Sequence, residues 1–110
     1  MLIDKSGNIT LITQERATIA ELVNRMNDMY NELQHDHIIF NLSSLDSIEL
    51  NSIVEFLDLS NRHRNSNHSF VIVTEQIDFD LVPDELVVVP TLQEAYDIIE
   101  MEEIERDLGF

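Results

Sequence analysis

The residues best suited to chemistry lie in one polar stretch between two apolar segments, IIFNLSSLDSIELNSIVEFL at residues 38–57. Its serines could accept a phosphate group, with Ser47 and Ser52 as the first candidates. Catalysis by paired carboxylates would need an enclosing pocket, which the sequence does not indicate. We therefore interpret Asp46 and Glu49 as charges that stabilise the start of a helix, with Asp46 or Ser47 as its N-cap.

A second candidate is the string His35-Asp36-His37. It resembles part of the His-x-His-x-Asp-His metal motif of metallo-β-lactamase-fold nucleases. The remaining histidine and the downstream ligands of that motif are missing, and a metal site needs several ligands at fixed distances. We expect this string to be a helix end and a strand start that face water.

The third candidate is the acidic segment 75–85, whose clustered carboxylates could bind calcium: Asp78, Asp80, Asp84 and Glu85. The segment lacks the glycine-turned twelve-residue pattern of an EF-hand. A solvated loop and a docking surface are the rival interpretations. We expect three apolar side chains to tether the loop to the core: Phe79, Leu81 and Val82.

Composition limits the classes of function. The chain has 110 residues, 44% of them apolar, and a formal net charge of −16. This length predicts a single domain with a buried core. The negative charge argues against nucleic acid or an anionic membrane as a partner, and it fits a soluble protein or one whose partner is basic. Disulfides, thiol catalysis and Cys-based zinc sites are excluded because the chain has no cysteine. We expect a cytoplasmic protein with no cleaved segment and no membrane span.

The first half of the chain predicts a hairpin, a helix and a strand. Residues 2–4 and 9–13 flank a Ser-Gly-Asn turn and should pair. Thr18 and Glu21 have the spacing of a capping box, and the apolar period after them predicts a helix over residues 18–34. The run HIIFNL at residues 37–42 predicts a buried strand.

A second helix is expected over residues 48–65, with these side chains facing inward: Leu50, Ile53, Val54, Leu57 and Ser60. Positive charge gathers at its end, where it would complement the helix dipole: Arg62, His63, Arg64 and His68. Buried strands should follow at residues 69–74 and 86–89, separated by an ordered loop or short turn. Thr91 and Glu94 then begin a helix to about residue 107, and Gly109 ends it.

The expected order is β-β-α-β-α-β-α, which places the fold in the α/β class. Continuous apolar strands separated by helices are typical of a mostly parallel sheet covered on both faces. In such sheets, ligands and partners bind beyond the carboxyl ends of the strands. The loops at 43–47 and 75–85 both lie at such ends.

This order and the polar stretch resemble the STAS domain, the module of anti-sigma factor antagonists and of the cytoplasmic tails of sulphate transporters. The family's typical strand end, Asp-Leu-Ser-Gly-Val, corresponds to Asn41-Leu42-Ser43-Ser44-Leu45. Its Ile-Asp-Ser-Ser-Gly-Leu corresponds to Ile48-Glu49-Leu50-Asn51-Ser52-Ile53. Asp46 and Ser47 separate the two motifs, and the family's spacing is kept without a gap. The closing TLQEAYDII also matches the family pattern, and the resemblance covers nearly the whole chain.

The departures from the family bear on its phosphorylation switch. The strand-end aspartate is Asn41 here, the phosphorylatable serine is Asn51, and the glycine after it is Ser52. The helix usual between the last two strands falls at 75–85, a short segment that contains Pro83, so we expect it to be reduced to a turn. The resemblance therefore implies a shortened relative, with a mixed sheet of about five strands, that lacks the usual phosphoserine switch.

We expect a single STAS-like domain over residues 1–110 that regulates by binding another protein, without catalysis and without cofactor or metal. The resemblance implies a bacterial protein and a partner such as a kinase-like anti-sigma factor. It places the binding surface on these residues: Ser44, Asp46, Ser47, Glu49, Asn51 and Ser52. Three alternatives stay open, namely a phosphorylation switch on a neighbouring serine, a small metal-dependent enzyme, and an acidic mimic of nucleic acid.

Overall fold

The computed structural model describes residues 2–14, 18–45 and 48–109, and these contain a five-stranded sheet. The strands lie side by side in chain order: β1 (Leu2–Ser6), β2 (Ile9–Thr13), β3 (His37–Asn41), β4 (Phe70–Val73) and β5 (Val87–Val89). β1 and β2 pair antiparallel, whereas β2 to β5 are parallel to one another. Gly7 turns the hairpin with a φ of 58°, in the left-handed region that glycine enters without steric cost. The predicted hairpin and the mostly parallel sheet are confirmed.

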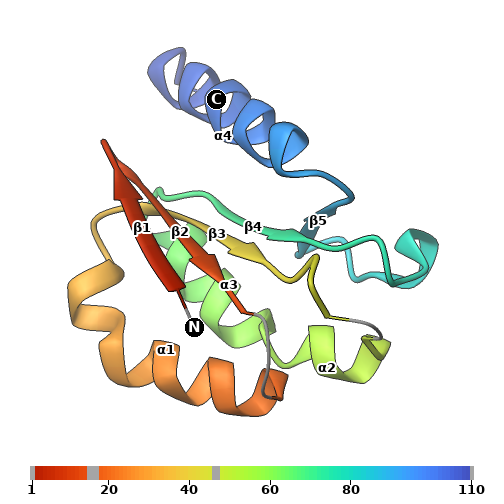
Figure 1. Ribbon diagram of the computed structural model, residues 1–110. Coiled ribbons are helices and arrows are strands. Elements are labelled where there is room, and N and C mark those ends of the chain that lie inside the picture. Colours follow the sequence, from red (N-terminus) through yellow and green to blue (C-terminus); the bar gives the residue numbers. More distant parts are fainter. Residues whose placement is uncertain (1, 15–17, 46–47, 110) are drawn as a thin grey trace.

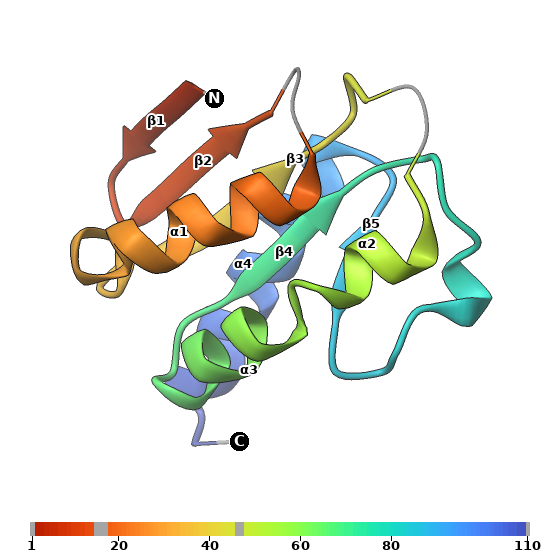
Figure 2. The same cartoon turned by 90° about the horizontal axis from the view of Figure 1, so that it is seen from below.

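The connections form the outer layers: α1 (Ile19–Leu33), α2 (Leu50–Val54), α3 (Leu57–Asn65), the 3₁₀ turn η1 (Phe79–Leu81) and α4 (Leu92–Asp107). α1, α2 and α3 cover one face of the sheet and α4 covers the other (Figure 1). From below, the first three helices lie in front of the sheet and α4 lies behind it (Figure 2). The predicted caps are present, because the hydroxyls of Thr18 and Thr91 accept from the backbone N–H groups of Glu21 and Glu94.

Each face of the sheet buries its own apolar cluster. Phe40 lies at the centre of the larger cluster, beneath α1 to α3, with its ring centroid 5.0 Å from those of Phe56 and Phe70. The smaller cluster lies beneath α4: Ile39, Val71, Val73, Ala95 and Ile99. β3 and β4 alternate between the two clusters, which explains why their sequences are continuously apolar.

The helix predicted over residues 48–65 is wrong, because the segment forms two helices. α2 ends at Val54, and the backbone N–H of Phe56 donates to the carbonyl of Ile53, three positions back. The buried residues at this junction recur every three positions: Ile53, Phe56 and Leu59. Because an α-helix has 3.6 residues per turn, a tighter turn is needed to bring Phe56 into the core. Val54, expected to face inward, is 37% exposed.

The acidic segment 75–85 forms η1, as the expected short turn. The carboxylate of Asp78 accepts from the backbone N–H of Asp80 and so begins this turn. Phe79 and Leu81 are exposed, so the predicted tether is wrong for both. Val82, by contrast, packs against the larger cluster, as does Ile77 on the other side of the turn. Three residues of 3₁₀ helix present few positions to the core, and the residues that flank them make the contact instead.

Candidate functional site

The described part of the loop after β3 and the start of α2 lie at the carboxyl ends of the parallel strands, and we call residues 41–45 and 48–52 the carboxyl edge. Asn41 organises the beginning of this loop. Its side-chain oxygen accepts from the Ser43 backbone N–H at 3.1 Å and from the Ser43 hydroxyl at 2.6 Å. Asparagine favours such turns because its short amide can replace a backbone acceptor. The strand-end asparagine therefore fixes the direction in which the chain leaves the sheet.

The predicted binding residues within the described chain all follow this turn. Ser44, Glu49 and Asn51 are exposed, and Ser52 is half-buried in α2. Asp46 and Ser47 lie outside the described residues. The predicted N-cap at either of these two is wrong, because the helix begins later, at Leu50, after an extended Glu49 that makes no side-chain cap. Ile48, just before that point, is buried.

Apolar side chains border these polar residues. Val54 is 37% exposed, and Leu45 and Leu50 are half-buried. Polar groups beside partly exposed apolar groups are typical of protein interfaces, whose apolar centre has a polar rim. The carboxyl edge thus offers both kinds of contact.

Neither acidic segments nor histidines form a metal site in the described chain. Within residues 2–14, 18–45 and 48–109, no three His, Cys, Asp or Glu side chains are arranged to hold a metal ion. In those same residues, no helix is long and apolar enough to cross a membrane.

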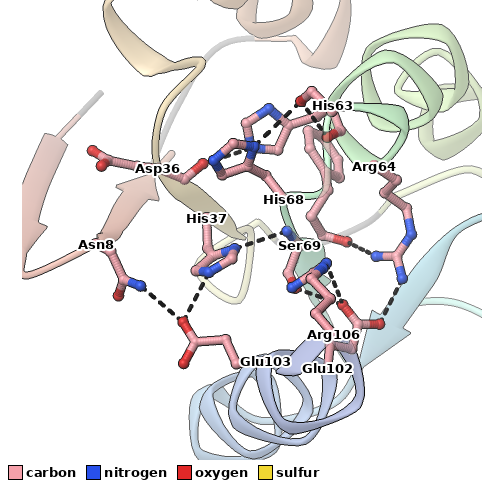
Figure 3. Close-up of polar contacts among 12 residues, drawn as sticks. Asn8, Asp36, His37, His63, Arg64, His68, Ser69, Glu102, Glu103 and Arg106 are labelled. Atoms are coloured by element: carbon pink, nitrogen blue, oxygen red, sulfur yellow. Dashed lines mark hydrogen bonds and ion pairs between the residues drawn. The ribbon is translucent and has the colours of Figure 1, made fainter. Parts of the chain in front are cut away.

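The amino ends of the parallel strands hold a second polar group that the sequence did not predict (Figure 3). We call it the amino-edge cluster: Asn8, Asp36, His37, His63, Arg64, His68, Ser69, Glu102, Glu103 and Arg106. These residues come from the hairpin, the start of β3, the end of α3, the start of β4 and the last turns of α4. An open hollow of about 320 Å³ lies beside the cluster and is lined by polar side chains, among them His35, Asn67 and Asp107.

His63 is fully buried in this cluster. Its Nε2 lies 2.6 Å from the backbone carbonyl of Asp36, and its Nδ1 lies 2.8 Å from the hydroxyl of Tyr30. Because a carbonyl can only accept, Nε2 carries the proton and Nδ1 accepts from the tyrosine. Burial lowers the pKa of His63 to about 4, so the ring is neutral at pH 7. The expectation that His63 caps a helix as a cation is therefore wrong.

Asp36 and His37 are also buried, so the expectation that the His35-Asp36-His37 string faces water holds only for His35. His37 accepts from the Ser69 backbone N–H at Nδ1, and its Nε2 lies 2.8 Å from a carboxylate oxygen of Glu103. Burial lowers the pKa of His37, although Glu103 partly opposes it.

The carboxylate of Asp36 contacts two residues of the hairpin, Thr10 and Lys5. Burial raises its pKa, but the hydrogen bond from the Thr10 hydroxyl and the contact with Lys5 outweigh that effect. The pKa of Asp36 therefore lies below its usual value, and the group is charged at pH 7. The start of β3 is a polar junction inside the protein.

The last turns of α4 are attached through the same cluster. Glu102 accepts from Arg64 at 2.5 Å and from the Ser69 hydroxyl at 2.6 Å, and Arg106 donates to that hydroxyl at 3.1 Å. The side-chain amide of Asn8 donates to Glu103 at 2.8 Å. Spacing along the chain gives no indication of these pairs, because they join residues that are 33 to 95 positions apart.

The contacts of the amino-edge cluster favour a structural role over a catalytic one. Both nitrogens of His37 and both nitrogens of His63 are already engaged, so neither buried imidazole has a nitrogen available as a general base. The carboxyl edge is an exposed polar surface with apolar neighbours, and the amino-edge cluster joins the elements to one another.

Comparisons with known proteins support this fold. No protein-family model matches the chain, and no curated protein matches it. Among solved structures, one similar chain comes from a study described as "Molecular architecture of the stressosome, a signal integration and transduction hub". It has a TM-score of 0.62 and 12% identity, over 91% of this chain and 96% of that chain. A serine-to-glutamate variant of RsbS from Moorella thermoacetica has a TM-score of 0.61 and 12% identity, over 90% and 96% of the respective chains.

Both of these similar structures are STAS-domain proteins. At 12% identity the likeness establishes the fold, and it extends over about nine-tenths of the chain. The protein therefore has a STAS-like fold, as the resemblance in sequence predicted.

Proposed function

We propose that the chain acts as a single non-catalytic regulatory domain that binds another protein through its carboxyl edge. The observation that carries the proposal is the STAS-like fold, shared over 91% of the chain with part of a signal integration and transduction hub. A domain of this kind works by occupying a partner's binding site. The resemblance in sequence makes a regulator such as a kinase-like anti-sigma factor the first candidate partner, in the cytoplasm.

Three described residues carry most of the proposed surface. Ser44, Glu49 and Asn51 are exposed, and Val54 beside them supplies a partly exposed apolar contact. Ser52 lies in the same helix, and the sequence adds Asp46 and Ser47, which are outside the described residues, to the proposed set. Because apolar contacts contribute to such a surface, the affinity should depend only moderately on salt. A nucleic-acid mimic would instead lose affinity steeply as salt rises.

Phosphate is not the switch at the position that the STAS pattern would use. Asn51 stands there, and an amide side chain cannot accept a phosphate. Docking is therefore not controlled by phosphorylation at that residue. Modification of Ser47 or Ser52 is the runner-up, and a Ser52→Asp variant with unchanged affinity would count against Ser52 as the switch.

The test is affinity capture of the regulator from the native lysate, with the captured proteins identified by mass spectrometry. The bait is the full chain as wild type or as Glu49→Arg with Asn51→Arg. A matched control carries Asp28→Arg with Asn24→Arg, which makes the same change of charge on exposed positions of α1.

Wild type and the α1 control should retain the same regulator, and the carboxyl-edge variant should lose it. Retention by all three baits would show that docking uses another surface. Capture of no regulator by the wild-type chain would reject the proposed function itself.

A further inference from the structure

α4 has apolar residues on both of its faces. Ala95 and Ile99 point into the smaller apolar cluster beneath the helix. On the opposite side, Met101, Ile104 and Leu108 are 51%, 53% and 66% exposed. Their spacing of i, i+3 and i+7 places them on one stripe of a helix, about 10 Å long at 1.5 Å per residue.

A single exposed apolar side chain is ordinary, but a stripe of three is not explained by the fold. α1 is a helix of nearly the same length, and it exposes no large apolar side chain. A surface helix normally keeps its apolar residues on the face that meets the core. α4 departs from that pattern, because Met101, Ile104 and Leu108 are exposed. No other ribbon lies on the side of α4 that faces away from the sheet (Figure 1).

Acidic residues border the stripe. These carboxylates are exposed on α4: Glu94, Asp97, Glu100, Glu105 and Asp107. In the described chain none of them has a basic side chain within ion-pair distance. Arg106, the only basic residue of the helix, points inward to the Ser69 hydroxyl. The outward surface of α4 is therefore an apolar stripe inside a border of negative charge.

We propose that this stripe, formed by Met101, Ile104 and Leu108, docks a basic amphipathic helix of another protein. An amphipathic helix presents apolar side chains at i, i+3 and i+7, which suits a stripe of this spacing. Lys or Arg on its flanks would meet the bordering carboxylates. A second copy of this chain would instead bring like charges together, in a protein whose net charge is −16.

The amino-edge cluster prepares this surface for binding. Glu102, Glu103 and Arg106 fasten the inward side of the same turns to Ser69, Arg64, His37 and Asn8. A helix that is already fixed loses little conformational freedom when a partner binds. The inference is independent of docking at the carboxyl edge, which lies at the opposite ends of the strands.

The test uses the full chain and a synthetic 18-residue helical peptide with Leu at i, i+3, i+4 and i+7 and Lys elsewhere. One control peptide keeps the lysines and replaces Leu by Ser, and another keeps the leucines and replaces Lys by Glu. Calorimetry at physiological salt should give affinities at least tenfold weaker for both controls. Met101→Ser with Ile104→Ser should weaken the Lys/Leu peptide at least tenfold, whereas Leu81→Ser, an equally exposed residue of η1, should leave it unchanged.

Equal binding of the peptide by wild type and the α4 variant would overturn the proposal, as would equal loss in Leu81→Ser. A map of amide NMR shifts on the wild-type chain needs no substitution. The shifts should centre on residues 97–108, and a map centred on α1 or η1 would refute the assignment. A further outcome is that the chain forms a dimer in the absence of peptide and that Ile104→Ser dissociates this dimer. The stripe would then be the interface with a second copy of the chain, and the proposal would be overturned.

Discussion

The two ends of the parallel strands are built from different kinds of contact. At the carboxyl ends, the side-chain hydrogen bonds of the described loops and caps join residues two or three positions apart, as in Asn41 to Ser43 or Thr74 to Gln76. At the amino ends there are local bonds too, such as Ser66 to His63, but others join residues 26 to 95 positions apart, and Asn8 to Glu103 is the longest of these. One end shapes its loops locally, and the other fastens distant elements together.

Because of this difference, we expect the amino ends to contribute mainly to the stability of the fold and the carboxyl ends mainly to binding a partner. A long-range bond between buried groups holds two elements in place, and its loss leaves a partner without water to replace it. A local bond in an exposed loop shapes the loop and leaves its outer groups free for a partner. We therefore expect substitutions at the amino edge to lower stability, and those at the carboxyl edge to lower affinity only.

The largest effect is expected from His63→Leu. This change removes the partners of the Asp36 carbonyl, whose bond to His63 is buried, and of the Tyr30 hydroxyl, whose bond is half-buried. The free energy of unfolding should fall by about 3 kcal/mol, which urea denaturation would measure. Affinity for the regulator should be unchanged at temperatures where the variant is folded. A loss below about 1 kcal/mol would mean that the ring is not a structural link.

Acidification should act through the same ring. The pKa of His63 is about 4 in the folded chain and 6.5 when unperturbed, so the unfolded chain binds more protons between these values. Stability from this residue is complete above pH 6.5 and is lost as the pH falls towards 4. Its contribution should fall by about 2 kcal/mol between pH 7 and pH 5. His37, whose pKa is also lowered, acts in the same direction.

The measurement is the difference in unfolding free energy between wild type and His63→Leu at both pH values, which cancels the titration of other groups. That difference should shrink by about 2 kcal/mol at pH 5. His35→Gln, which changes an exposed histidine, should follow the wild type at both values. A constant difference between wild type and His63→Leu would contradict the assignment.

A smaller effect is expected from Glu102→Gln. The glutamine keeps the shape but loses the charge that accepts from Arg64 at 2.5 Å and lies 3.7 Å from Arg106. We expect a loss of about 1 kcal/mol in thermal or urea unfolding. Glu105→Gln, on the exposed side of the same helix, should change stability by less than about 0.5 kcal/mol. Equal effects in the two variants would remove the distinction between the inner and outer sides of α4.

The smallest effect on stability is expected at the carboxyl edge. Ser44→Ala with Asn51→Ala alters exposed side chains and should change the unfolding free energy by less than about 0.5 kcal/mol. The same variant should bind the captured regulator more than tenfold less tightly in calorimetry. A large loss of stability in this variant would contradict the expectation that carboxyl-edge residues contribute to binding and not to stability.

The sequence predicts most of the fold because its patterns are local. Apolar runs locate β3, β4 and β5, and the Thr18 and Thr91 caps locate the starts of α1 and α4. It does not predict the break between α2 and α3, which depends on how Phe56 packs against Phe40 and Phe70. How these rings pack is a property of the folded core, and the spacing of apolar residues along the sequence does not reveal it.

The amino-edge cluster is beyond sequence reasoning for a related reason. A polar string such as His35-Asp36-His37 normally faces water, and the burial of Asp36 and His37 is possible only because other elements bring partners. Glu103 comes from α4 and Thr10 from β2, so the partners are known only once the fold is known. The carboxyl edge was found more readily, because its position follows from topology alone.

The order of the strands has a consequence for how the chain folds as it is made. Each strand pairs with the strand just before it, so β2 to β5 can join the growing sheet in turn as the ribosome releases them. The hydrogen bond between Asn8 and Glu103 cannot form early in synthesis, because it needs both the first hairpin and the last helix. The contacts of the amino-edge cluster should therefore form last. A chain that stalls before residue 103 would have an ordered sheet that lacks the contacts of Glu103 with Asn8 and His37.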